Sequence, residues 1–409
     1  MTEWRKVKLG DCCTKIGSGA TPKGGATVYI DSGTSFIRSQ NVYNLAFDYN
    51  GLTHITEEAA QRLAGVTVRE EDVLLNITGD SVARTCIVPP QVLPARVNQH
   101  VSILRTNKEI INSRYLNYYL ASPHMQAYML GLAVGKGASR NAMTKNMIEN
   151  FEVPCPPLEI QDRVVTVLSR YDALIENYQR QIKLLEEAAQ RLYKEWFVDL
   201  HFPGHQSTPI INNLPEGWEK RKIGDFARIK SGFAFKSKDW QTLGCPVVKI
   251  KDITGTFVST NDLDCVPIEV ARNASSFVLN KGDLVIAMTG ATIGKIGLLT
   301  ENGIYTNQRV GKFFMNDKYL LPFSYCFFKQ ETTTKMILQI SSSSSAQPNI
   351  SGGQLESFEF ACNSKLINDF NLIMYPCFSQ MIHLKSQINL LAEARDRLLP
   401  KLMSAEIEV

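Results

Sequence analysis

One stretch of this chain, residues 158–197, constrains the fold more than any other. Apolar residues recur in it at steps of three and four from Ile160 to Trp196, so they form a single seam along one helix face. No Gly or Pro interrupts the stretch, and Pro156 and Pro157 stand at its entrance, where proline is tolerated. Such a helix would be about 60 Å long. One globular domain cannot bury so narrow a seam, so the helix needs a partner helix.

A second seam near the other end of the chain supplies that partner. Apolar residues recur from Ile367 to Leu402, and residues 387–394 (QINLLAEA) resemble residues 181–188 (QIKLLEEA). Pro376 is a departure, because a proline inside a helix costs about 3 kcal/mol. The sequence therefore predicts a kink or a split near the start of this second helix. Two unrelated core helices are the alternative, but the similarity does not stop at the helices.

The chain repeats one design twice, with matching segments in the same order. The pairs are residues 4–11 and 218–225, 36–42 and 247–253, 72–79 and 283–290, 98–101 and 307–310, and 150–153 and 357–360. Short β-branched runs in these segments are typical of strands, and Gly- and Asn-rich turns separate them. Because chance similarity does not preserve order, we predict a tandem duplication. Each half is an α+β globule followed by a long helix.

The predicted domains follow from this repeat. They are a first globule at 1–156, a helical region at 157–200, a linker at 201–215, a second globule at 216–363 and a second helical region at 364–409. Two equivalent helices pair most simply as an antiparallel coiled coil, because a two-fold axis relates that arrangement. Two similar heads at a fixed separation suit a two-part target. Duplex DNA, with a helical turn of about 34–36 Å, is the commonest target of that kind.

Composition excludes several other classes of protein. The net charge is only +4, and the helical regions contribute none of the cationic excess, so tight DNA binding by this chain alone is not expected. Nine cysteines without a Cys-x-x-Cys motif indicate a reducing compartment, with neither disulfides nor a zinc site. No apolar run approaches the roughly 20 residues that span a bilayer, and the N-terminus has no signal-peptide core. We expect a cytoplasmic protein that does not bind a membrane.

Catalytic motifs are weak throughout the chain. Residues 290–295 (GATIGK) and 131–136 (GLAVGK) resemble phosphate-binding loops but are one residue short and lack the Ser or Thr after the Lys. His201 and His205 are four residues apart, but the Pro-Gly between them prevents a helix that could present both to one metal ion. We therefore expect no catalytic residue, metal or cofactor in this chain.

Side chains suited to recognition are better represented, because the turns carry groups that can form bidentate hydrogen bonds to bases. The candidates in the first half are Arg38, Gln40, Asn41, Gln99, His100, Lys136, Ser139, Arg140 and Asn141. Those in the second half are Lys249, Lys251, Gln308, Arg309, Gln347 and Asn349. Asn98 and Asn307 recur in both halves, and the alternative is that they close turns. Positions that differ between the halves, such as His100 and Arg309, are better candidates for reading different bases.

With these features the chain resembles the DNA-specificity (S) subunits of type I restriction–modification enzymes. Four segments carry the resemblance: residues 156–161 (PPLEIQ), 193–199 (YKEWFVD), 201–204 (HFPG) and 214–218 (LPEGW). The second helical region departs from the family pattern, because CNSK stands at 362–365 where a Pro-Pro-Leu-like start is expected. The resemblance covers essentially the whole chain.

The resemblance implies a non-catalytic subunit of a larger complex. Residues 1–156 and 216–363 would be target-recognition domains, each reading one half of a bipartite, asymmetric site in double-stranded DNA. The coiled coil would set the unread spacer and dock two methyltransferase (M) subunits, and restriction (R) subunits would join them. S-adenosylmethionine, ATP and Mg²⁺ would be bound by those partners, which would methylate adenine after base flipping.

Two other functions stay open on the sequence alone. A nuclease could use Asp72 or Asp283, although each precedes a predicted strand, where an aspartate commonly begins a turn. A two-headed adaptor that binds proteins would also fit two similar globules joined by helices.

Overall fold

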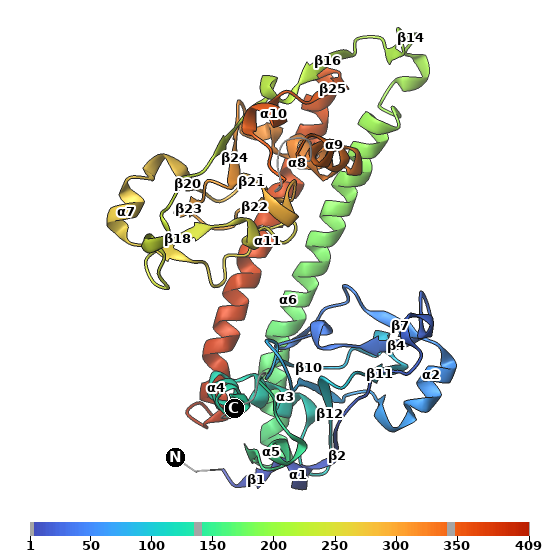
Figure 1. The fold of residues 1–409 in the computed structure, drawn as a ribbon, viewed down its shortest axis with the longest axis vertical. Helices are drawn as coiled ribbons and strands as arrows, with labels where there is room; N and C mark the ends of the chain where they lie inside the picture. Colours follow the sequence, from blue (N-terminus) through green and yellow to red (C-terminus); the bar gives the residue numbers. More distant parts are fainter. Residues whose placement is uncertain (1–3, 135–140, 342–347, 409) are drawn as a thin grey trace. The chain divides into compact units, whose positions relative to one another are not determined.

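The computed structural model describes residues 4–134, 141–341 and 348–408, and the chain divides into two compact units. Unit 1 comprises Met1–Leu174 and Leu391–Val409, and unit 2 comprises Ile175–Leu390. Each unit contains one globule and a segment of each of two long helices, α6 (Leu158–Tyr193) and α11 (Ser364–Met403) (Figure 1).

The globule of unit 1 is built on two sheets. The first sheet has the strand order β10-β9-β12-β2 and is antiparallel throughout. Its strands are β2 (Cys13–Ser18), β9 (Val73–Asn76), β10 (Thr85–Ile87) and β12 (Val101–Thr106). The second sheet has the order β3-β7-β4-β11-β8, and β4 and β11 form its parallel pair. Its strands are β3 (Tyr29–Ile30), β4 (Thr34–Ile37), β7 (Thr53–Ile55), β8 (Thr67–Val68) and β11 (Ala95–Val97).

Strand β9 is buried on both faces because it lies between two cores. Leu74 packs with side chains of the second sheet such as Val97, whereas Val73 and Leu75 pack toward the helices. A strand covered on both sides reads as a continuous apolar run rather than an alternating one, which explains the run of β-branched and leucine residues in the sequence.

Helices α3 (Ser113–Ala121) and α4 (Pro123–Ala133) pack in the same core as Val73 and Leu75 of β9. The Asn112 side chain caps α3 by accepting the N–H of Arg114 at 2.8 Å. In the same core, Val164 and Leu168 of α6 pack with Leu399 and Leu402 near the end of α11.

Unit 2 repeats this architecture. Its antiparallel sheet has the order β17-β24-β21-β22, with strands β17 (Ala227–Ser231), β21 (Leu284–Ala287), β22 (Ile296–Leu298) and β24 (Val310–Met315). Its second sheet has the order β19-β18-β23-β20, with strands β18 (Cys245–Val248), β19 (Cys265–Val266), β20 (Val278–Leu279) and β23 (Ile304–Thr306). Here β18 and β23 form the parallel pair, as β4 and β11 do in unit 1. The predicted duplication of an α+β globule is confirmed.

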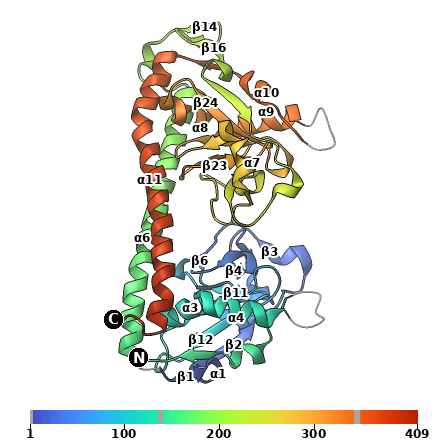
Figure 2. The same ribbon diagram turned by 90° about the vertical axis from the view of Figure 1, so that its left-hand side faces the viewer.

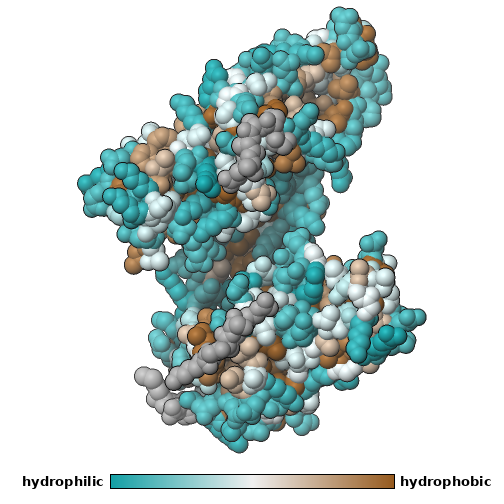
Figure 3. Space-filling model, viewed as in Figure 1, coloured by the Kyte–Doolittle hydropathy of each residue, from teal (hydrophilic) through white to brown (hydrophobic). Residues whose placement is uncertain are grey.

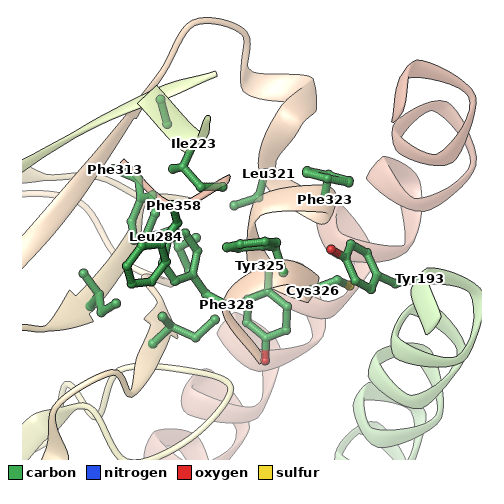
Figure 4. Close-up of a cluster of buried hydrophobic side chains, with 14 of the residues drawn as sticks. Tyr193, Ile223, Leu284, Phe313, Leu321, Phe323, Tyr325, Cys326, Phe328 and Phe358 are labelled. Atoms are coloured by element: carbon green, nitrogen blue, oxygen red, sulfur yellow. The ribbon is translucent and has the colours of Figure 1, made fainter. Parts of the chain in front are cut away.

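An aromatic cluster joins the globule of unit 2 to both long helices (Figure 4). Tyr193 of α6 lies 5.5 Å, between ring centroids, from Phe323 of α8 (Leu321–Lys329) and 5.9 Å from Phe370 of α11. Trp196 and Phe197 follow in a π-helical turn (Lys194–Val198), and both rings meet the Phe370 ring edge to face. The surface of unit 2 that faces the viewer in Figure 3 is, by contrast, largely hydrophilic.

The two long helices pair in antiparallel orientation within each unit (Figure 2). In unit 2, Tyr193 contacts Phe370, whereas Ile182, earlier in α6, packs with Ile388, later in α11. In unit 1, Asp172 pairs with Arg395, and earlier residues of α6 pack with later residues of α11. The predicted antiparallel pairing is confirmed. Among the described residues, no helix combines the length and the apolar character needed to cross a membrane.

The predicted split at Pro376 is wrong, because α11 is one helix from Ser364 to Met403. Pro376 leaves the carbonyl of Leu372 without its helical N–H partner. Leu372 is 74% exposed, so water can reach that carbonyl and the loss is tolerated. The helix begins without the expected prolines because the Asn363 side chain accepts the N–H groups of Lys365 and Leu366, at 3.0 and 3.2 Å.

Candidate nucleic-acid interface

In each unit the parallel strand pair brings two turns together at one edge of its sheet. In unit 1, β4 and β11 end side by side, and the N–H of Asn98 donates to the Ile37 carbonyl at 3.0 Å. In unit 2, the N–H of Asn307 donates to the Val248 carbonyl at 3.1 Å. The turns at 38–41 and 98–100 are therefore neighbours, as are those at 249–252 and 307–309.

The antiparallel sheet adds a third turn to the same edge. The N–H of Ile77 donates to the His100 carbonyl at 2.9 Å, and the N–H of Met288 donates to the Arg309 carbonyl at 2.9 Å. We call these grouped turns the ledge. It comprises residues 38–41, 78–79, 98–100 and 141 in unit 1, and residues 249–252, 289–290, 307–309 and 348–349 in unit 2.

Two asparagines build the same turn in both ledges. The Asn98 side chain accepts the N–H of His100 at 3.1 Å, and the Asn307 side chain accepts the N–H of Arg309 at 3.2 Å. Both asparagines are buried. The interpretation of Asn98 and Asn307 as residues that close turns is supported.

A glycine packs against each of these turns. A Cβ atom at Gly19 would overlap the Val97 carbonyl oxygen, and one at Gly232 would overlap the hydroxyl and carbonyl oxygens of Thr306. The Ser-Gly sequence that recurs in both halves therefore reflects a close backbone approach beneath the ledge.

In unit 1, the first turn of the ledge is held by one loop. Arg38 Nη2 and Gln40 Nε2 both donate to the Gly51 carbonyl, at 2.8 and 3.2 Å. Asn41 is fully buried, accepts the N–H of Arg38 and donates to the Asp48 carbonyl at 2.9 Å. The amide of Asn41 is therefore used within the turn and is not accessible for a base contact, so its prediction as a base-contacting residue is wrong.

Gln99 and His100 belong to a chain of side chains on the ledge of unit 1. The Gln99 amide lies 3.2 Å from His100 Nε2 and accepts the hydroxyl of Thr21, and His100 Nδ1 contacts the hydroxyl of Thr78. Donation from Gln99 to Nε2 places the imidazole proton on Nδ1, which then donates to Thr78. Gln99 is exposed and His100 half-buried, so the outer edge of this chain is accessible.

In unit 2, the corresponding first turn carries charge. The ammonium groups of Lys249 and Lys251 lie 2.9 and 2.8 Å from the same oxygen of Asp264. Hydrogen bonds from Lys251 and Lys249 lower the pKa of Asp264, and the bond to Asp264 raises the pKa of Lys251. Asp252 takes the place of Asn41 beneath the turn, where it accepts the N–H of Lys249 at 2.8 Å, and burial raises its pKa.

The remaining candidates of the ledge are exposed. Gln308 and Arg309 project from unit 2, and within the described part of the chain neither side chain has a hydrogen-bond or ion-pair partner. Residues 141–142 and 348–349 run beside 78–79 and 289–290 in matching register, in which Asn141 corresponds to Pro348 and Asn349 to Ala142. Four candidates from the sequence, Lys136, Ser139, Arg140 and Gln347, lie outside the described residues.

The model of one protein family, the type I restriction modification DNA specificity domain, matches residues 1–187 and 215–362. The chain belongs to this family. The predicted resemblance is confirmed, and the chain is the DNA-specificity component of a type I restriction–modification system. The two matched ranges each contain one globule and one ledge.

Curated relatives extend over the whole chain at low identity. The MjaIX specificity subunit of Methanocaldococcus jannaschii is 23% identical, with 100% of this chain and 94% of the relative covered. The HindI specificity subunit of Haemophilus influenzae is 20% identical, with 100% of each covered. A solved structure, the S subunit of a type I restriction–modification system from M. genitalium, shares the fold with a TM-score of 0.57 and 15% identity, over 98% of this chain and 96% of that one.

The two aspartates considered for a nuclease each form an ion pair inside their own unit instead. Asp72 is 1% exposed and binds Arg105 through both carboxylate oxygens, at 2.8 and 2.7 Å. Asp283 pairs with Lys312 at 2.6 Å. The two aspartates occupy equivalent places before β9 and β21, although their cations come from different positions of β12 and β24. Both carboxylates also cap the turn before their strand. The nuclease alternative is not favoured.

Two cations next to the ledges were not predicted from the sequence. Arg84 and Lys295 occupy equivalent places, six residues after Thr78 and Thr289. Arg84 stacks 4.5 Å from the centroid of the Tyr43 ring, and Lys295 is exposed. Residues 290–295 form a tight turn, with the N–H of Gly294 donating to the Ala287 carbonyl, rather than a phosphate-binding loop. The shared spacing from the Thr-Gly pair was the signal that could have identified both cations.

Proposed function

We propose that each ledge reads one half of a bipartite, asymmetric site in double-stranded DNA, and that this chain acts without catalysing a reaction itself. The single observation that carries the proposal is that the two ledges share their backbone hydrogen bonds but differ in their side chains. Arg38 and Gln40 stand where unit 2 has Lys249 and Lys251, and His100 stands where unit 2 has Arg309. A duplicated scaffold with different polar groups suits two different half-site sequences.

The proposed DNA contacts follow from the accessible side chains of the ledges. They are Arg38, Gln40, Gln99, His100 and Asn141 in unit 1, and Lys249, Lys251, Gln308, Arg309 and Asn349 in unit 2. Arg84 and Lys295 join them as candidates for phosphate contacts, because a cation beside a groove-reading turn meets the DNA backbone. Lys136, Ser139, Arg140 and Gln347 stay predictions from the sequence.

The proposed complex contains two methyltransferase (M) subunits, which bind α6 and α11, and restriction (R) subunits that join them. S-adenosylmethionine would bind the M subunits, and ATP and Mg²⁺ the R subunits, so none of these is assigned to this chain. We propose that the paired helices set the unread spacer, which is supported by the finding that α6 and α11 are each one uninterrupted helix. A chain with this role would act on the DNA of the cytoplasm.

In this proposal the functional domains keep the boundaries expected from the sequence. The target-recognition domains span 1–156 and 216–363, the helical regions span 157–200 and 364–409, and residues 201–215 link the halves.

The experiment that tests the function is a map of adenine methylation in genomic DNA from cells with and without this gene. A split motif, with two short half-sites around a fixed gap, should disappear on deletion. Purified complex of this chain with its M subunits should bind and methylate the same motif. A complex that assembles but selects no DNA sequence would contradict the proposal and favour a two-headed protein adaptor.

The spacer is tested by lengthening both helices. Insertion of four residues, about one helical turn, near Ala188 would disturb contacts of unit 2, because the neighbouring Ala189 is buried in its core. Matched insertions after residues 174 and 390, where the units divide, avoid those cores. The spacer preference should change while both half-site sequences stay the same. Altered half-sites with an unchanged spacer would contradict the proposal that the paired helices set the spacer.

A further inference from the structure

One carboxylate on the ledge of unit 2 holds two lysines. Asp264 Oδ2 lies 2.9 Å from Lys249 Nζ and 2.8 Å from Lys251 Nζ. All three groups are accessible, since their side chains are 37%, 26% and 58% exposed, respectively. The proposed function uses the two lysines but gives Asp264 no role.

The position of Asp264 places this cluster at the reading edge. Asp264 immediately precedes β19, and its carbonyl accepts the N–H of Val247 in β18 at 2.9 Å. It therefore lies beside the end of β18, where the turn 249–252 begins and where 307–309 follows the parallel strand β23. The cluster and Arg309 thus belong to one edge of one sheet.

Lys249 is restrained from three directions. Its Nζ lies 3.3 Å from the centroid of the Trp240 ring, and its backbone N–H donates to the buried carboxylate of Asp252. Asp264 supplies the third restraint. A lysine is ordinarily a mobile point charge on a flexible stem, which suits phosphate contacts anywhere along the DNA backbone. These restraints remove that mobility.

Restraint changes what the ammonium groups can do. Each has three N–H donors, so the bond to Asp264 leaves two for a ligand. Fixed donors can be matched to acceptors at fixed positions, such as N7 of purines and O6 of guanine in the major groove. The carboxylate also cancels one of the two positive charges, which weakens attraction to phosphates of any sequence.

Unit 1 restrains the same two positions without a carboxylate. Arg38 and Gln40 both bind the Gly51 carbonyl, which carries no formal charge. The two units therefore share the device of tying both side chains to one acceptor. Unit 2 uses a charged acceptor because both of its side chains are cations.

On these grounds, and resting on the proposed function, we propose that Asp264 is a positioning residue for base reading. It holds Lys249 and Lys251 as directed donors to purine acceptors in the major groove of one half-site, and it suppresses their binding to phosphates. Asp264 itself need not touch the DNA.

The test uses the assembled complex of this chain with its M subunits, in wild-type form and with Asp264→Asn. A mismatched base pair in the half-site read by unit 2 lowers the affinity of the wild-type complex by some factor, and in the variant this factor should be about tenfold smaller. That change is within the range for a lost base contact. Affinity for non-cognate DNA should rise. The slope of the logarithm of the binding constant against the logarithm of salt concentration should become steeper by about one unit. Penalties in the other half-site should not change.

Three further measurements separate positioning from a structural role. Asp264→Glu should restore selectivity. Replacing purines of that half-site by their 7-deaza analogues, which lack the N7 acceptor, should weaken wild-type binding more than binding by Asp264→Asn. Lys251→Gln, at an exposed position, should lose selectivity in the same half-site while its salt dependence becomes shallower, and it provides the test if Asp264→Asn does not fold.

Asp225→Asn is the matched control. Asp225 also pairs with a cation, Arg221 at 2.9 Å, and it accepts a backbone N–H, but it precedes β17, whereas the ledge lies beyond the far end of that strand. It should leave selectivity and salt dependence unchanged.

Unchanged mismatch penalties in Asp264→Asn, or an equal loss for all sequences, would overturn the inference. These results differ from failure of the proposed function itself, in which the wild-type complex would already show no sequence selection.

Discussion

The two ledges have the same backbone and different chemistry. Matching hydrogen bonds tie 98–100 to Ile37 and Ile77 in unit 1, and 307–309 to Val248 and Met288 in unit 2. Unit 1 presents the amide of Gln99 and the imidazole of His100 beside Arg38. Unit 2 presents Arg309 together with Lys249 and Lys251, which share the carboxylate of Asp264. The comparison teaches that the turn-forming residues were constrained by the fold, whereas the side chains above them could change.

The contacts between each globule and α6 have diverged further. Tyr118 in α3 and Tyr325 in α8 lie one position apart when these two nine-residue helices are aligned, and the hydroxyl of each donates to a carboxylate of α6. The carboxylates are not equivalent: Tyr118 uses Asp172, whereas the ring of Tyr325 meets Phe378 at the position that corresponds to Asp172, and its hydroxyl reaches Glu186. A buried tyrosine hydroxyl needs a partner, and in both units α6 supplies it, from positions that do not correspond.

The largest effect should come from filling the close approach beneath the ledges. Gly19→Ala and Gly232→Ala should each lower the free energy of unfolding by about 3 kcal/mol, because the new methyl group overlaps backbone oxygens. Denaturant unfolding with hydrogen exchange would locate each loss in its own unit. Gly17→Ala is the control, since no heavy atom lies within 4 Å of a Cβ atom there. A loss in only one unit would break the equivalence of the two ledges.

Removing the carboxylates on α6 should affect unit 1 more than unit 2. Arg395 Nη1 lies 2.6 Å from Asp172 and is 13% exposed, so Asp172→Asn weakens a largely buried ion pair and should cost about 2 kcal/mol. Glu186 receives hydroxyl groups from Tyr325 and Thr256, so Glu186→Gln should cost about 1 kcal/mol. Thermal unfolding would measure both changes.

The control for this comparison is Asp396→Asn. Asp396 is 55% exposed and also pairs with Arg395, and removal of a surface pair of this kind should cost less than about 0.5 kcal/mol. Equal losses of unfolding free energy for Asp172→Asn and Glu186→Gln would show that the two carboxylates of α6 stabilise their units equally.

Substitution at the paired reading positions should separate the half-sites. Arg309→Ala and His100→Ala should each weaken discrimination by about 1–3 kcal/mol, in different half-sites, because each would remove a proposed base contact. Binding by the assembled complex to DNA with single mismatches would measure this. A uniform loss across all sequences would instead assign the residue to the phosphate backbone.

The smallest effect should appear at the residue beneath the first turn, where unit 1 has Asn41 and unit 2 has Asp252. Burial raises the pKa of Asp252 above its ordinary value of 3.8, so the ionised form is disfavoured in the folded state. Asp252→Asn keeps the acceptor for the Lys249 N–H and should be slightly more stable than the wild type at pH 7. As the pH falls through the raised pKa and then below 3.8, the wild type becomes protonated and the difference should disappear.

Asp225→Asn should behave in the opposite way. A hydrogen bond from the Lys222 N–H and one from Arg221 lower the pKa of Asp225, so its ionised form stabilises the fold at neutral pH. This variant should be less stable than the wild type at pH 7, and acid should remove the difference. Unfolding measured between pH 3 and pH 7 distinguishes the two signs. A stabilising Asp225→Asn would contradict this account.

The sequence by itself determined the architecture. A seam with a period of three and four can be buried only by another helix, so α6 and α11 had to pair, and ordered similarity over both halves required two similar globules. The repeated turn segments also predicted most of the residues that form the ledges, because turns demand particular residue types.

Only the tertiary structure decided which polar side chains can meet a ligand. Asn41 and Gln40 are neighbours in the sequence, yet one is buried and the other exposed. Asp264 joins Lys249 and Lys251 because β19 pairs with β18, and Pro376 is tolerated because Leu372 faces water. Local patterns specify the turns and helices, but burial and charge pairing depend on residues brought together from distant parts of the chain.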